Sequence, residues 1–231
     1  MAETEQRLGI ICAMQIELTD ILEQSSTVTE RRIGRRIYYE AVLNGCPIVA
    51  TVCGIGKVNA ASTTQELITV FEPSMVVNSG IAGALADGLR PGDVVLATGL
   101  DYHDFDLGYF TELPVPLATD EGLLSLAQQT AEEQIPGQWV AGLIVSGDAF
   151  IQSQAVKEDI IQRTQALAVD MESASVAQVA TLNACPVLII RSISDLADDD
   201  ADATYDDFEA QAAARSAALL AALASRLVTV H

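Results

Sequence analysis

The sequence predicts a three-layer α/β/α fold in which helices flank a central mixed, twisted sheet. Short apolar runs rich in Val and Ile alternate with longer stretches of helical period, a pattern typical of a buried, mainly parallel sheet. Half of the 231 residues are hydrophobic, which is enough for one large core, and no Pro/Gly/Ser-rich linker divides the chain. We therefore expect a single domain across residues 1–231.

The first half of the chain opens with a strand and a short helix and continues with two or three strands in direct succession. Because no helix separates these strands, they are expected to pair as hairpins and to make the sheet mixed. The elements expected here are strands at 8–13, 27–33, 37–43, 47–53 and 75–78, and helices at 18–22 and 58–71.

The second half alternates strands and helices around one irregular segment. Residues 101–118 contain aromatic residues, two prolines and no clear period, which indicates a functional or interface loop. The last helix carries an Ala/Leu-rich stripe and is expected to pack across the sheet. The elements expected here are strands at 93–97, 138–145, 167–169 and 186–191, and helices at 121–133, 155–164, 172–182 and 205–227.

Polar or Gly-rich clusters follow six of the expected strands. In an open α/β sheet, ligands bind outside the carboxyl ends of the strands, so these clusters are expected to converge on one pocket. They lie at 14–17, 54–57, 80–83, 146–151, 171–172 and 191–195.

Composition excludes several classes of partner. A formal charge of −20 repels nucleic acid and anionic membranes, so neither is expected as a partner. The apolar runs are too short to span a membrane, and the charged start does not resemble a secretory signal; we expect a soluble, cytoplasmic protein. Four cysteines without metal-type spacing predict free thiols, and two histidines leave almost no zinc ligands, so neither metal nor cofactor is expected.

Three short segments carry candidate chemistry. Residues 54–57 (Gly-Ile-Gly-Lys) resemble part of a phosphate loop, but Val58 stands where Ser or Thr is required, which favours a tight turn. Residues 170–173 open a helix, where acidic residues are either functional or simple caps. Residues 191–195 place a cation, two hydroxyls and a carboxylate after an apolar strand; a structural Arg–Asp pair is the alternative.

Taken together, these segments resemble the nucleoside phosphorylase/nucleosidase superfamily, most closely its 5′-methylthioadenosine/S-adenosylhomocysteine nucleosidase branch. The matching pieces are collinear and span residues 9 to 208, and the longest of them is specific. They are Gly9-Ile10-Ile11, Ala13-Met14, Glu17, Gly54-Ile55-Gly56-Lys57-Val58, Asn78, Gly80, Ala82-Gly83, Tyr102-His103-Asp104, the ten residues from Gly142 to Ile151, Met171-Glu172, Arg191 and Ile193-Ser194-Asp195.

The resemblance implies hydrolysis of an N-glycosidic bond of an adenine nucleoside by a homodimer. It assigns protonation of adenine N7 to Asp195, activation of the attacking water to Glu17, and the ribose hydroxyls to Glu172. Arg191 is expected to help place the water and the carboxylates. The substrate-binding residues it implies are Phe150 and Ile151 for adenine; Met14, Ile55, Met171 and Tyr205 for the ribose and its 5′ group; Ala82, Gly83 and Ser194 in the matched turns; and Leu107 and Phe110, which would be lent across the dimer interface.

The chemistry agrees with these roles on physical grounds. Adenine leaves poorly as an anion, so cleavage needs a general acid, which a partly buried Asp of raised pKa supplies. The ribose acquires oxocarbenium character, which a nearby carboxylate stabilises. A base must ready a water molecule, and three carboxylates in one site push their pKa values apart, as separate acid and base roles require.

Some positions depart from the family pattern. Ile81 occupies a turn position where relatives often have Ser, Asp170 stands where Glu is usual, and the loop after Phe110 is shortened. These departures leave the 5′ pocket the least determined part. The alternatives are 5′-deoxyadenosine or aminofutalosine as main substrate, a phosphate-dependent nucleoside phosphorylase, and a non-catalytic nucleoside-binding protein on the same fold.

Overall fold

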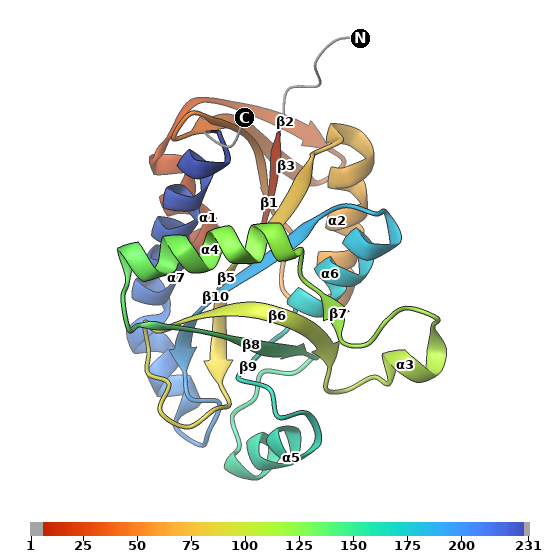
Figure 1. Cartoon of the computed structure of the whole chain (residues 1–231), viewed down its shortest axis with the longest axis vertical. Coiled ribbons are helices and arrows are strands. Elements are labelled where there is room, and N and C mark those ends of the chain that lie inside the picture. The colour runs from red at the N-terminus through yellow and green to blue at the C-terminus, as the bar shows by residue number, and fades with distance from the viewer. Residues whose placement is uncertain (1–6, 229–231) are drawn as a thin grey trace.

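The structure, a computed structural model, describes residues 7–228 apart from the side chain of Phe110. Within these residues a ten-stranded mixed sheet lies between two layers of helices (Figure 1). Helices α2 and α6 pack on each other on one face, and α1 and α4 pack on α7 on the other. The predicted three-layer α/β/α fold is confirmed.

The elements follow the expected order along the chain. The strands are β1 Leu8–Cys12, β2 Ser25–Ile33, β3 Arg36–Leu43, β4 Cys46–Val52, β5 Met75–Ala84, β6 Val94–Tyr102, β7 Leu117–Ala118, β8 Trp139–Ser146, β9 Ala168–Asp170 and β10 Val187–Asp195. The helices are α1 Gln15–Glu23, α2 Lys57–Phe71, α3 Leu107–Phe110, α4 Glu121–Gln134, α5 Gln154–Thr164, α6 Ser173–Leu182 and α7 Ala201–Leu227.

The sheet closes partly on itself. Strand β5 pairs with β10 and β9, and the order β10-β6-β8-β9 completes a ring of five strands. The β1-β4-β3-β2 side extends from β5 as an open sheet. Because β1, β4, β5 and β10 run parallel, their carboxyl ends meet at one edge, where ligands bind in this architecture.

Two strands run further than the apolar pattern predicts. Strand β5 was expected to end at Asn78 and β10 at Arg191, but they remain paired, with Arg191 opposite Gly80 and Asp195 opposite Gly83. The polar residues that end the apolar runs stay inside the ladder because their backbone groups are paired and their side chains find buried partners. The candidate residues 191–195 therefore lie within a rigid strand.

Helix boundaries and the irregular segment also differ in detail. Helix α7 begins at Ala201, four residues before the expected start, and α1 begins at Gln15. The segment 101–118 holds the end of β6, the one-turn helix α3 and the two-residue strand β7. Their short length explains why no period is visible in the sequence.

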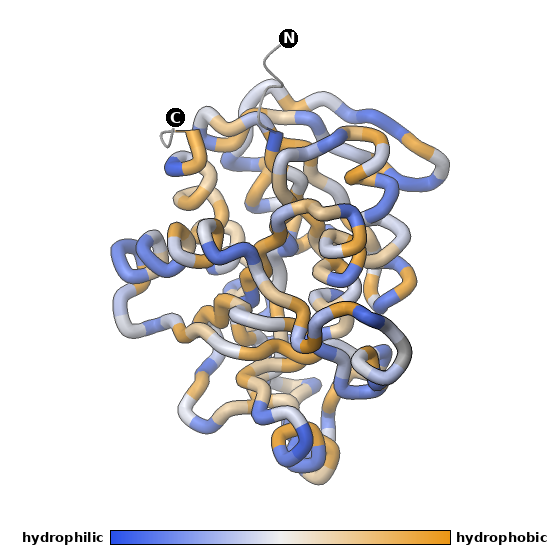
Figure 2. The backbone as a smooth tube through the Cα atoms, turned by 45° about the vertical axis from the view of Figure 1, so that its right-hand side comes forward, coloured by the Kyte–Doolittle hydropathy of each residue, from blue (hydrophilic) through white to orange (hydrophobic). Residues whose placement is uncertain are grey.

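Hydropathy follows the layers. Figure 2 shows hydrophobic segments concentrated in the interior and hydrophilic ones on the outer helices and loops. Edge strand β2 is exposed along most of its length and carries Glu30, Arg31 and Arg32, charges that discourage pairing with another sheet. The four cysteines are free thiols, as expected. Among residues 7–228, no helix combines the length and apolar character needed to cross a membrane.

Candidate active site

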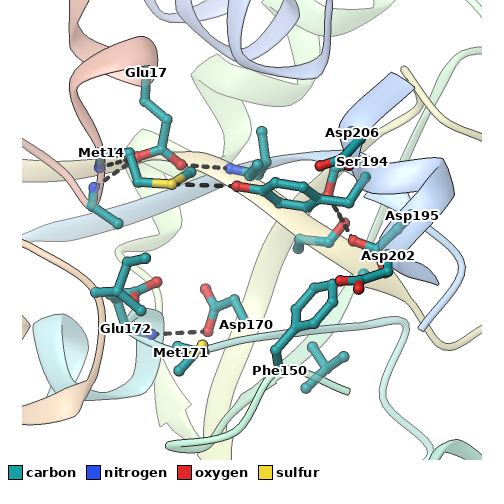
Figure 3. Close-up of a pocket in the computed structure, with 17 residues that line it drawn as sticks. Met14, Glu17, Phe150, Asp170, Met171, Glu172, Ser194, Asp195, Asp202 and Asp206 are labelled. Carbon is teal, nitrogen blue, oxygen red and sulfur yellow. Dashed lines mark hydrogen bonds between the residues drawn. The ribbon is translucent and has the colours of Figure 1, made fainter. Parts of the chain in front are cut away.

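A cavity of about 320 Å³ opens where the polar strand ends meet. Residues from β5, β9, β10, α1 and α7 and from the turns after β1, β4 and β8 line it, so the predicted convergence is confirmed (Figure 3). Its lining residues are Ala13, Met14, Glu17, Ile55, Ile81, Ala82, Gly83, Phe150, Val169, Asp170, Met171, Glu172, Ser194, Asp195, Asp202, Tyr205 and Asp206.

Glu17 lies in the first turn of α1 with its carboxylate held by backbone groups from two elements. Its Oε2 accepts hydrogen bonds from the N–H groups of Ala13 (2.7 Å) and Met14 (2.9 Å), and its Oε1 accepts one from Ile81 (3.1 Å). Burial raises the pKa of Glu17 above its ordinary value, while Arg191 and these N–H groups favour the carboxylate. The group is thus a fixed, buried base facing the cavity.

Asp195 ends β10 on another wall of the cavity. Its Oδ2 accepts a hydrogen bond from Ser194 Oγ (2.8 Å) and its Oδ1 accepts one from the N–H of Ala197 (2.8 Å). A Cβ on Gly83 would lie 2.8 Å from Asp195 Oδ1, so only glycine permits this approach. Burial raises the pKa of Asp195, which favours the protonated form that a general acid needs.

Glu172 immediately precedes α6 and faces the cavity from the β4–α2 side. Its Oε1 accepts a hydrogen bond from the N–H of Gly56 (2.7 Å). Burial, followed by the neighbouring Asp170, raises the pKa of Glu172 to about 7, although Arg191 and the Gly56 N–H favour its ionised form. Near neutral pH this carboxyl group therefore exchanges readily between its two protonation states.

Behind these carboxylates lies a buried ion pair. Arg191 Nε donates to Asp170 Oδ2 at 2.7 Å, and Arg191 Nη2 donates to Asn78 Oδ1. Asp170 also accepts hydrogen bonds from the hydroxyls of Ser146 (2.5 Å) and Ser173. Both side chains are almost fully buried, so each charge needs the other. Arg191 does not line the cavity; it anchors Asp170, which does.

The remaining wall is largely apolar. The Phe150 ring meets the Tyr205 ring edge-on at 5.6 Å, and the Tyr205 hydroxyl lies 3.3 Å from Met14 Sδ and donates to Glu209 Oε1 at 2.7 Å. Ile81 packs with Met14 and Tyr205, while its backbone N–H serves Glu17. A planar apolar group therefore fits beside Phe150, and a flexible apolar group fits beside the methionine.

The structure places most of the sequence-predicted residues at this cavity. Ile151 lies one shell further, lining a small adjoining cavity with Phe150 and Asp195. The predicted residues found in the main cavity are Glu17, Glu172, Asp195, Met14, Ile55, Ala82, Gly83, Phe150, Met171, Ser194 and Tyr205.

The prediction for Leu107 is wrong. Its side chain is 1% exposed and packs in the chain's own core, because α3 turns it inward. It is therefore not available to a partner subunit. The exposed large hydrophobic residue among the described side chains of this helix is Tyr109, at 79%. The side chain of Phe110 lies outside the described part of the structure, so its predicted role stays a prediction.

The sequence did not predict two parts of the site: the backbone N–H groups that hold the carboxylates, and the two aspartates that α7 adds to the cavity wall. The N–H groups of Ala13, Ile81 and Gly56 could not be predicted from the sequence, because every residue except proline has a backbone N–H. Asp202 and Asp206 also line the cavity, and Asp202 belongs to the first turn of α7, which begins before the expected start at residue 205. Among residues 7–228, no group of three or more His, Cys, Asp or Glu side chains has the arrangement of a metal site.

Comparison with known proteins identifies the family. The model of the Phosphorylase superfamily matches residues 7–228. The 5′-methylthioadenosine/S-adenosylhomocysteine nucleosidase of Staphylococcus carnosus is 37% identical over 222 residues, covering 92% of this chain and 96% of that protein.

Two solved structures show the same fold. The nucleosidase of that name from Neisseria meningitidis, in complex with methylthio-immucillin-A, superposes with a TM-score of 0.92 at 36% identity, covering 96% of this chain and 99% of that one. The futalosine hydrolase of Helicobacter pylori gives 0.91 at 35% identity, covering 96% and 98%. The chain belongs to the Phosphorylase superfamily and, within it, to the 5′-methylthioadenosine/S-adenosylhomocysteine nucleosidase family.

Proposed function

We propose that this chain hydrolyses the N-glycosidic bond of 5′-methylthioadenosine and S-adenosylhomocysteine, releasing adenine and the 5-substituted ribose. The observation that carries the proposal is the convergence of Glu17, Glu172 and Asp195 on one cavity beside Phe150 (Figure 3). The proposal includes a cytoplasmic location and a role in methionine salvage, where the enzyme clears by-products of methylation. The proposed reaction uses only side chains of the protein and a water molecule.

The proposed reaction divides the work among the three carboxyl groups. Asp195 donates its proton to adenine N7 as the C1′–N9 bond breaks, so adenine leaves as a neutral base. Glu172 holds the ribose hydroxyls, and its charge stabilises the oxocarbenium-like ribose. Glu17 removes a proton from the water that forms the new C–O bond at C1′. The proton count then balances, since one proton leaves Asp195 and one arrives on Glu17.

Hydrolysis is favoured over phosphorolysis by the charges around the cavity. A phosphate nucleophile is normally held by several cations, arginine above all. Among the described residues, no Lys, Arg or His lines the cavity, and Arg191 lies behind Asp170. The deciding experiment is adenine release in phosphate-free buffer: we expect turnover at the same rate with and without added phosphate. A strict requirement for phosphate would replace this proposal by phosphorolysis.

A second candidate substrate class deserves the same assay. The Helicobacter pylori relative is a futalosine hydrolase, which supports testing aminofutalosine, together with 5′-deoxyadenosine, beside the thioethers. These nucleosides share the reacting bond and the adenine ring and differ only at the ribose 5′ carbon. The carboxylate roles are common to all of them.

The largely apolar cavity wall predicts how kcat/KM depends on the substituent at the ribose 5′ carbon. Met14, Met171 and Tyr205 make a wall that suits a thioether, whereas the 5′ hydroxyl of adenosine loses hydration beside them, costing roughly 1–3 kcal/mol. Asp202 and Asp206 repel a 5′ phosphate. We expect kcat/KM to be at least roughly 10-fold higher for methylthioadenosine than for adenosine, with AMP nearly inert. Adenine release under matched conditions checks this; faster cleavage of adenosine or AMP would contradict it.

We further propose that the chain forms a homodimer through the side on which α2, α6 and α3 lie (Figure 1). Val58, at the start of α2, is 79% exposed, as is Tyr109 of α3, and Ile55 beside the cavity is 52% exposed. Apolar exposure of this kind is typical of an interface. In this arrangement the partner's α3 would cover the open side of the cavity.

The dimer is tested by sedimentation. We expect twice the 24.5 kDa chain mass, and we expect Val58→Glu to dissociate the dimer and lower activity, because it buries a charge at the interface. Val156→Glu, at the 44% exposed Val156 of α5, is the matched control and should change neither. A fully active wild-type monomer would contradict the proposal.

A further inference from the structure

Three charged side chains form a cluster beside the cavity without lining it. Lys57 Nζ, from the first residue of α2, lies 2.7 Å from both carboxylate oxygens of Asp104 and 3.6 Å from Asp148 Oδ2. The backbone N–H of Asp148 donates to Asp104 Oδ2 at 3.0 Å. The cluster thus ties together the start of α2, the segment after β6 and the loop after β8.

This cluster is connected to Glu172 through two consecutive backbone groups. The N–H of Lys57 donates to Asp148 Oδ1 at 2.9 Å, and the N–H of Gly56 donates to Glu172 Oε1 at 2.7 Å. Gly56 has φ +99°, which L side chains rarely adopt. The two N–H groups belong to adjacent peptide groups of one tight turn, so we expect loss of the contacts on the Lys57 side to disturb the Gly56 N–H as well.

A second connection runs from the cluster to the helix that follows Glu172. Lys57 Nζ lies 5.4 Å from the centre of the Tyr102 ring. The Tyr102 hydroxyl donates to Gln178 Oε1 at 2.7 Å and lies 3.1 Å from Ser175 Oγ, both on α6. The cluster therefore holds the residue after the donor of the Gly56–Glu172 hydrogen bond and also contacts, through Tyr102, the helix that follows the acceptor.

We propose that Lys57, Asp104 and Asp148 are positioning residues that hold the Gly56 N–H on Glu172 and keep this carboxylate ready to bind the ribose. The proposal rests on the proposed role of Glu172. None of the three side chains lines the cavity, so their effect reaches the substrate only through Glu172. Partly exposed ion pairs contribute little to folding stability, so a structural role alone predicts almost no change in activity.

The charges that face Glu172 determine the direction of the effect. Burial, Asp170 and Glu17 raise the pKa of Glu172, whereas Arg191 and the Gly56 N–H lower it. The neighbouring Cys53 thiol stays neutral because burial raises its pKa. If the Gly56 hydrogen bond is lost, the pKa of Glu172 rises from about 7, and less of the carboxylate is ionised at lower pH. Catalysis should then suffer on the acid side and recover on the alkaline side.

The test compares pH profiles of kcat/KM for methylthioadenosine in Lys57→Met and Asp104→Ala. Both variants loosen the turn, so both should move the acid limb to higher pH; a rise of one pKa unit lowers kcat/KM on that limb by about tenfold. Through-space electrostatics alone predicts opposite shifts, because one variant removes a positive charge and the other a negative one. Parallel shifts support positioning; opposite shifts or unchanged profiles overturn it.

Control variants distinguish the positioning role of the cluster from the ribose-binding role proposed for Glu172. Arg36→Met removes a comparably exposed ion pair, Arg36–Glu66, which joins β3 to the same helix α2, and should leave the profile unchanged. Lys57→Arg keeps the cation and should restore much of the wild-type profile. Glu172→Gln tests the underlying role: if it stays fully active, the function proposed for Glu172 fails. If it is impaired while the Lys57 and Asp104 variants match wild type, only the positioning proposal fails.

Discussion

Asp195→Asn is expected to lower kcat on methylthioadenosine by at least roughly 10²-fold, the typical contribution of a general acid. The amide keeps the shape of the carboxyl group, and its oxygen still accepts the Ala197 N–H that Asp195 accepts now. The amide can also donate a hydrogen bond to N7, but it has no proton to give up to adenine. Substrate binding and the fold should therefore persist while the C1′–N9 bond breaks slowly.

The measurement combines steady-state kinetics with thermal unfolding. The melting temperature should stay close to wild type, and KM should change much less than kcat. The control substrate is a 5-methylthioriboside that carries nitrophenolate in place of adenine. Nitrophenolate leaves as a stable anion without being protonated, so Asp195→Asn should lose far less activity on this substrate than on methylthioadenosine. Asp202→Asn, at an exposed carboxylate of the same cavity, is the matched control and should stay within a few-fold of wild type. Near-normal turnover of methylthioadenosine by Asp195→Asn would show that Asp195 is not the general acid.

The pH dependence follows from the same side chain. Because burial raises the pKa of Asp195, its proton is retained to higher pH than in an ordinary aspartic acid. Glu17 and Glu172, whose pKa values are also raised by burial, must lose their protons before they can act. The active form has Glu17 and Glu172 ionised and Asp195 protonated at the same time, so the profile of activity against pH should be bell-shaped.

The layer arrangement was predictable because it depends on periodicity. Alternating apolar runs and amphipathic stretches identify buried strands and covering helices, and directly successive strands identify the hairpins that make the sheet mixed. The closed ring through β5 and β10 was not predictable. It depends on buried polar positions such as Asn78 and Ser192, which interrupt the apolar pattern while the backbone ladder continues.

Much of the site was predictable because its chemistry resides in side chains of distinctive type at strand ends. Glu17, Glu172 and Asp195 are of this kind, and the structure brings them to one cavity. The features that were not predicted depend on the direction in which a side chain points, which the residue type does not determine. Leu107 looked like an interface residue from its neighbours, yet the single turn of α3 points it into the core.

Glu17→Gln is the second substitution with a large expected effect. Glu17 has two roles in the structure: its carboxylate accepts the N–H groups of Ala13 and Met14 just before α1, which caps the helix, and it faces the cavity as a base. Gln keeps the capping role because its oxygen accepts the N–H groups of Ala13 and Met14, but its amide nitrogen cannot accept the Ile81 N–H. Gln also cannot take a proton from water. We expect kcat to fall by roughly 10²-fold or more, and the loss of stability to be limited to the one hydrogen bond from the Ile81 N–H.

Glu17→Ala separates the two roles further. It removes the base and the cap together, so kcat should fall as in Glu17→Gln, and the free energy of unfolding should also drop by about 0.5–2 kcal/mol. Kinetics and denaturant unfolding of both variants decide the matter. If Glu17→Gln keeps its activity while Glu17→Ala loses stability, Glu17 is a helix cap only and the water is activated elsewhere. If Glu17→Gln is inactive but stays folded and more stable than Glu17→Ala, the buried carboxylate is required for the chemistry itself, because the side-chain shape and the hydrogen bonds from Ala13 and Met14 are then kept while the basicity is gone.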